Sequence, residues 1–111
     1  MKSDNLAVEV NELHADICSA LADAKRILIL YALEEQPQTV NDLANKVGLS
    51  QPAASRHLKI LRERGLVRAE RQGVNIEYSL TDLRLIQALD LLREVLRERI
   101  QYRASLIENE S

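Results

Sequence analysis

Side chains that can read nucleic acid are concentrated between Gln51 and Gln72. Gln pairs with adenine and Arg with guanine through two hydrogen bonds each, and Ser can bond to bases or to phosphate. Lys and further Arg side chains suit phosphates, which fix the register of a protein on a duplex. The candidates for contact with DNA are Gln51, Ser55, Arg56, His57, Lys59, Arg62, Arg71 and Gln72. For His57, a phosphate contact and the orientation of its neighbours are both open.

The local charge agrees with this interpretation. Residues 50–74 hold six basic and two acidic side chains, so they carry +4 in a chain whose formal net charge is −2, and the remainder carries −6. A basic segment in an acidic chain is typical of a protein that turns one face to a polyanion. On charge alone, a basic helix face that is only solvated explains the pattern equally well.

Helix signals place most of these side chains on the second helix of a helix–turn–helix. Thr39 can cap a first helix, with Asp42 in the place usually taken by Glu or Gln. Gly48 can supply the left-handed residue that ends this helix, and Ser50 can cap the next one. In such a motif the second helix enters the major groove with its N-terminal end first, while the first helix braces it.

The second helix, from Gln51 to about Arg64, has two faces. Ala54, Leu58 and Leu61 recur at helical spacing and should be buried. The candidate DNA contacts lie on the opposite side. The caps and the two-faced pattern together favour DNA reading over a basic face that is only solvated.

Residues 66–80 alternate between apolar and polar side chains across a turn at Gln72-Gly73, which predicts a β-hairpin. Arg71 and Gln72 lie near its tip, where they could reach an adjacent minor groove or the DNA backbone. The side chains expected to point inward are Val67, Ala69, Ile76, Tyr78 and Leu80. Residues 39–80 together form the predicted DNA-reading unit.

Apolar stripes in the sequence before and after this unit predict helices that complete its hydrophobic core and pair two copies of it. The segment after Asp23 is apolar on most sides and ends at Pro37, so it should be the central buried helix. Residues 1–21 and 82–107 should form the first and last helices. The apolar stripe of the last helix extends past what one subunit can cover, so we expect a homodimer paired through these two helices. That stripe consists of Leu83, Ile86, Leu89, Leu92 or Val95, Leu96 and Ile100.

Length and composition fit one mainly α domain over residues 1–111. Three Tyr without Trp or Phe require an aliphatic core, and one Cys excludes an intramolecular disulfide and a Cys-cluster zinc site. The first residues do not read as a signal peptide. No run approaches the ~20 apolar residues of a membrane span. We therefore expect a cytoplasmic protein with no membrane partner.

Several stretches resemble the ArsR/SmtB family of winged-helix repressors. The resemblance covers about residues 12–96 and is carried by ADAKRILIL at 22–30, LSQPAASRHLKILR at 49–62, GLV at 65–67 and YSLT at 78–81. It implies a mainly α, winged helix-turn-helix fold with a small β-hairpin. It further implies a homodimer, paired through the first and last helices, that represses transcription at a palindromic operator and is released by an effector.

The departures from the family concern metal binding. Arsenic and cadmium sensors carry a Cys-x-Cys motif near the start of the helix before the recognition helix, but residues 40–43 contain no Cys. Zinc and nickel sensors carry Asp and His ligands along the last helix. Asp82 could match that Asp, but Leu83, Arg84 and Leu91 stand where His would be needed. The usual metal sites are not intact, and we expect no cofactor.

His14 and Cys18 lie four residues apart, on one face of the first helix. Two copies in a dimer could form a four-ligand metal site, or Cys18 could act as a redox switch. We favour a structural role, because Cys is commonly buried and His14 can lie at the rim of the interface. A metal- or redox-responsive repressor and a non-DNA protein-interaction module on the same fold are the alternatives. No enzyme is expected, because the sequence has neither a phosphate-binding glycine loop nor a nucleophile–base pair.

Overall fold

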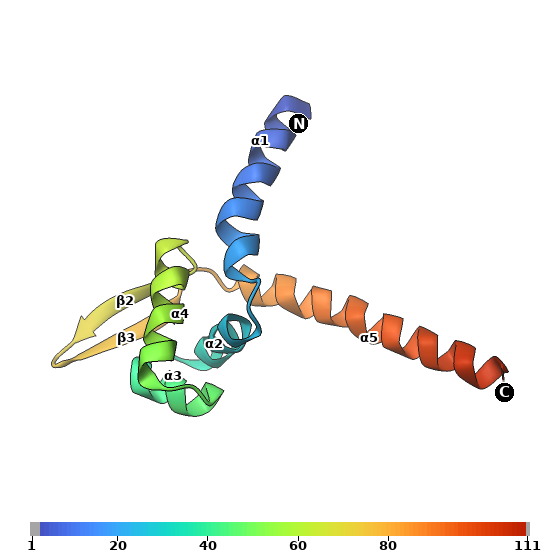
Figure 1. The fold of residues 1–111 in the computed structure, drawn as a ribbon. Coiled ribbons are helices and arrows are strands. Elements are labelled where there is room, and N and C mark those ends of the chain that lie inside the picture. The colour runs from blue at the N-terminus through green and yellow to red at the C-terminus, as the bar shows by residue number, and fades with distance from the viewer. Residues whose placement is uncertain (1–2, 111) are drawn as a thin grey trace.

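Two helices extend in different directions from a central body, as Figure 1 shows. The computed structural model describes residues 3–110. Its elements are α1 (Ser3–Glu12), the π-helix η1 (Leu13–Cys18), α2 (Ala24–Glu35), β1 (Gln38–Thr39), α3 (Val40–Val47), α4 (Gln51–Glu63), β2 (Val67–Gln72), β3 (Asn75–Leu80) and α5 (Arg84–Glu110). The extended helices are α1 and α5, so the chain measures 60 × 42 × 21 Å.

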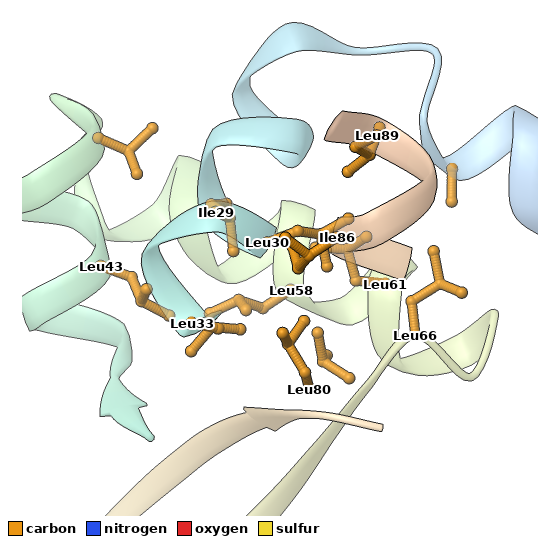
Figure 2. Packing of buried hydrophobic residues seen from close by; sticks show 13 residues of the cluster. Ile29, Leu30, Leu33, Leu43, Leu58, Leu61, Leu66, Leu80, Ile86 and Leu89 are labelled. Atoms are coloured by element: carbon orange, nitrogen blue, oxygen red, sulfur yellow. The ribbon is translucent and has the colours of Figure 1, made fainter. Parts of the chain in front are cut away.

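The core is aliphatic, and α2 runs through its centre. Ile29 and Leu30 of α2 are fully buried and belong to one cluster with Leu43 of α3, Leu58 of α4 and Ile86 of α5 (Figure 2). Each such side chain contributes roughly 1.5–3 kcal/mol when it is buried. The prediction of a central buried helix is confirmed.

Side-chain caps begin three helices at the predicted residues. Asp23 caps α2, Thr39 caps α3 and Ser50 caps α4, each by accepting a hydrogen bond from a backbone N–H in the first turn. Gly48 ends α3 with φ of 73°, and Gly65 follows α4 with φ of 77°, both in the left-handed region that favours glycine. These signals fix the direction in which α4 leaves the turn.

The wing is a three-stranded antiparallel sheet with strand order β1-β3-β2. The predicted hairpin is confirmed, because β2 pairs with β3 from Val67–Leu80 to Gln72–Asn75. The edge strand β1 was not predicted, since two polar residues carry no readable alternation. Gln38 of β1 is buried, and its side-chain amide donates a hydrogen bond to a backbone carbonyl of α2. This bond attaches the wing to the core.

Two positions of the predicted apolar patterns, one in the hairpin and one in the last helix, are exposed in the protomer. Ile76 is 46% exposed, because the hairpin extends past the core toward its tip. Leu83 is 59% exposed, because it lies before the first turn of α5. Val67 and Leu80, at the base of the hairpin, are buried as predicted.

The last helix is attached to the core only at its beginning. Ile86 and Leu89 are buried, and the hydroxyl of Tyr31 in α2 donates a 2.6 Å hydrogen bond to Asp90. Burial, and then this bond, raise the pKa of Tyr31. Further along, α5 exposes the apolar side chains Leu92, Val95, Leu96 and Ile100.

The first helix departs from a plain α-helix. α1 continues into the π-helix η1, and Leu6, Val10 and Leu13 are exposed along this segment. A π-helix is uncommon and could not be predicted from the apolar spacing that indicated the helix. Among the described residues, no helix is long and apolar enough to cross a membrane.

Candidate nucleic-acid interface

The core holds α4 by one face and leaves the other in solvent. Ala54, Leu58 and Leu61 are all 0% exposed, as the two-faced pattern predicted. Because these three side chains fix the rotation of the helix, its remaining positions have defined directions. The predicted contact residues on the solvent side are Gln51, Ser55, Arg56, Lys59 and Arg62, and all five are exposed.

An open hollow of about 260 Å³ lies between α4 and the wing. It is lined by Ser55, Arg56, Lys59, Arg62 and Tyr78. Tyr78 comes from β3 and is half-buried, so its ring forms one wall beside the basic side chains. We had expected Tyr78 only as an inward packing residue. Its place in the hollow depends on how the wing lies against α4, and a local sequence pattern does not predict that arrangement.

The basic side chains around this hollow and at the wing tip are available for an anion. The side chains of Arg56, Lys59, Arg62 and Arg71, which we call the basic face, have no ion pair or hydrogen bond with any residue in the described range 3–110. Two other basic residues of the segment are engaged: Arg64 lies 3.4 Å from Asp16, and Arg68 lies 3.9 Å from Glu70. The described chain therefore does not neutralise the basic face.

The tip of the wing is fully in solvent. Arg71 and Gln72 are exposed at the end of β2, and Gly73 turns the chain with φ of 65°. Val74 beside it is 99% exposed. The wing thus carries Arg71 and Gln72 away from α4, where they can contact a separate part of a bound duplex.

His57 differs from the other candidates because it faces α2. It is half-buried, and its Nδ1 lies 3.4 Å from Nη1 of Arg26. A guanidinium can only donate, so Nδ1 is the acceptor and the remaining ring proton of a neutral imidazole is on Nε2. The structure brings the other α4 candidates together on one face and sets His57 at the edge of that face.

The residues considered for sensing are both in η1. His14 and Cys18 are exposed in the single protomer, and the expectation of a structural role stays a prediction about the dimer interface. Cysteine is buried on average, but here Cys18 lies on a segment that projects from the body. Within the described part of the chain, no three His, Cys, Asp or Glu side chains are grouped so as to hold a metal ion.

The arrangement defines a winged helix-turn-helix protein. A braced second helix, an exposed basic face and a wing beside it form the DNA-binding geometry of that class. The chain belongs to the family described as bacterial regulatory proteins of the arsR family, whose sequence profile matches residues 23–69.

Comparison with known proteins supports this assignment. The chain is 43% identical over 76 residues to the HTH-type transcriptional regulator NmtR of Mycobacterium tuberculosis, covering 68% of this chain and 63% of that protein. It is 40% identical over 84 residues to the nodulation protein NolR of Rhizobium meliloti, covering 76% and 69%. The chain thus spans about two thirds of the length of these two relatives.

Solved structures share the fold over most of the chain. A homodimeric winged helix-turn-helix DNA-binding domain from Mycobacterium bovis, described as a possible ArsR-family regulator, superposes with a TM-score of 0.76 at 28% identity, covering 91% of this chain and 93% of that one. NolR from Sinorhizobium fredii superposes with a TM-score of 0.72 at 39% identity, covering 86% and 93%. The predicted fold class is confirmed.

Proposed function

We propose that the chain is a transcriptional repressor that binds a palindromic operator as a homodimer and is released by an effector. The observation that carries the proposal is the basic face, whose side chains are exposed and unpaired in the described chain; three of the four, Arg56, Lys59 and Arg62, are presented by a helix whose rotation the core fixes. Phosphate contacts supply much of the affinity of such proteins, and base contacts supply the sequence preference. Because its partner would be chromosomal DNA, the protein acts in the cytoplasm.

In this proposal the residues divide by their place on the surface. The N-terminal end of α4 reads base edges in the major groove, the middle of α4 contacts phosphates, and the wing tip reaches the adjacent minor groove or backbone. The three sets are Gln51, Ser55 and Arg56; Lys59 and Arg62; and Arg71 and Gln72. His57 belongs beside the second set, as a phosphate contact.

In this proposal a second copy of the chain completes the DNA-binding protein. The apolar side chains of α5 from Leu92 to Ile100, with Leu6, Val10 and Leu13 of the first helical segment, are exposed in one protomer. Exposure of so many adjacent apolar side chains to water is unfavourable, so we assign residues 1–21 and 82–107 to the dimer interface. Two recognition helices related by a two-fold axis would match half-sites about 34–36 Å apart, one turn of DNA.

Regulation would act on the spacing of the two copies. Within the described residues of one protomer no metal-ligand group is formed, so a metal effector would need ligands from both copies. His14 and Cys18 are the available pair, and exposure of the Cys18 thiol favours a redox response as the second candidate. Cys18→Ser should abolish a response to oxidant, and an intact response in this variant excludes Cys18 as the sensor.

The test of DNA binding is a mobility shift with the gene's own upstream region. At moderate salt we expect a shift by the dimer that an unrelated duplex competes for poorly. Absence of any shift would favour the other use of this fold, a protein-interaction module. Footprinting then locates the two half-sites and tests whether they are related by a palindrome.

A further inference from the structure

One largely buried arginine contacts both the first helix and the recognition helix. The side chain of Arg26, in the first turn of α2, is 13% exposed. Its Nε donates to the carbonyl oxygen of Ala20 at 2.6 Å, and its Nη2 donates to that of Ser19 at 3.3 Å. Its Nη1 lies 3.4 Å from Nδ1 of His57 in α4 and 3.8 Å from the carboxylate of Asp23. The guanidinium therefore joins the end of the first helix, six residues earlier in the chain, to the recognition helix, 31 residues later.

At one end, Arg26 holds the last turn of the first helix. The carbonyl groups at the C-terminal end of a helix have no partners within the helix, and a cation there is also favoured by the helix dipole. Arg26 satisfies two of these carbonyls, those of Ser19 and Ala20. Since residues 1–21 are assigned to the dimer interface, this contact joins the interface to the body of the protomer.

At the other end, Arg26 faces one of the two ring nitrogens of His57, Nδ1. Arginine stays charged and has no acceptor, so His57 can keep the contact only with a lone pair on Nδ1. The proton of the neutral ring is then on Nε2. The two ring nitrogens point to opposite sides, so with Nδ1 turned to α2 the Nε2–H points away from α2. His57 is half-exposed and follows Arg56 of the basic face.

We propose that Arg26 is a positioning residue for operator binding. It orients His57 so that Nε2–H donates to a phosphate. It also connects His57 to the first helix, so that a change in the geometry of the dimer alters this phosphate contact through a single side chain. The inference rests on the proposed function, since it requires α4 to bind DNA. The charge of Arg26 is balanced locally by Asp23, so its role is to aim a neighbour and not to attract the polyanion.

The test is a double-mutant cycle on DNA affinity. The variants are Arg26→Gln, His57→Ala and the double variant, each titrated against a duplex from the gene's own upstream region and against an unrelated duplex. Each protomer loses one charge-assisted contact to phosphate, which is worth about tenfold, so the dimer should bind about a hundredfold more weakly. Because Arg26 acts through His57, the double variant should bind about as weakly as His57→Ala alone. Additive losses of about ten-thousandfold in the double variant, or no loss in Arg26→Gln, overturn the proposal.

Two controls separate positioning from simple stabilisation. Lys25, the neighbour of Arg26, donates to the carbonyl oxygen of Val47 at 3.1 Å and has no described contact with α4, so Lys25→Gln should leave the affinity unchanged. Arg26→Lys keeps the charge but cannot reach three segments, so it should bind as weakly as Arg26→Gln while remaining folded. Full affinity in a folded Arg26→Lys protein contradicts the positioning role.

Arg56→Ala separates a failure of the proposed DNA binding from a failure of the proposed role of Arg26. If it leaves binding to the upstream duplex intact, α4 does not read DNA and the proposed function fails with it. If Arg56→Ala weakens binding but the cycle is additive, the proposed function stands and the role of Arg26 does not.

Discussion

Replacement of Arg56 by Ala tests whether α4 reads bases. Arg56 is exposed and has no ion pair or hydrogen bond with the described residues, so its removal breaks no internal contact and should change stability by less than about 0.5 kcal/mol. A bidentate Arg–guanine pair contributes about 1–3 kcal/mol of discrimination. A dimer carries two copies, so operator binding should weaken by about 2–6 kcal/mol, or roughly 30-fold to more than 10⁴-fold.

The same variant should bind an unrelated duplex almost as well as the wild type, because it loses only one positive charge per protomer. We expect less than about a tenfold loss there at moderate salt. Fluorescence anisotropy with both duplexes at one salt concentration measures the ratio directly. Equal losses on the two duplexes would refute base reading by Arg56 and leave it as a phosphate contact.

Three further predictions concern phosphate binding, pairing and acid stability. Lys59→Ala should lower the slope of log affinity against log salt by about 0.9 per protomer on both duplexes, and an unchanged slope removes its phosphate role. Leu96→Glu places a charge in the exposed apolar row of α5 and should yield monomers in sedimentation, whereas Val74→Glu at the wing tip should stay dimeric; dimers from both would reject the assigned interface. The side chain of Arg84, and then its backbone N–H, lower the pKa of Asp82 from 3.8 to about 2. The carboxylate therefore stabilises the fold above about pH 3.8 and loses this contribution as the pH falls through about 2, so thermal unfolding of Asp82→Asn should depend less on pH in that window, and an unaltered profile contradicts the pairing.

Local signals predicted most of the reading unit. Capping residues such as Ser50 and the left-handed Gly48 act within one turn, so their effect can be read from neighbours in the sequence. The same holds for the face of α4 that Leu58 marks. For this reason the exposed candidates on α4 could be named before the structure was known.

What could not be predicted depends on contacts between distant segments. The strand β1 is recognisable only by its pairing with β3, through Gln38 and Tyr78. The place of Tyr78 in the hollow and the contact between Arg26 and His57 likewise need the packing of α2, α4 and the wing. Cys18 is exposed because η1 projects from the body, a property of overall shape that the residue type does not carry.

Thr39 belongs to two elements at once, because it ends β1 and caps α3. Because no residue separates the wing from the helix–turn–helix at this point, there is no linker that could act as a hinge. We therefore expect the wing and the helix–turn–helix to move together. A signal that shifts the outer helices would then change the spacing of the two units in the dimer, and not the angle between the wing and α4 within either unit.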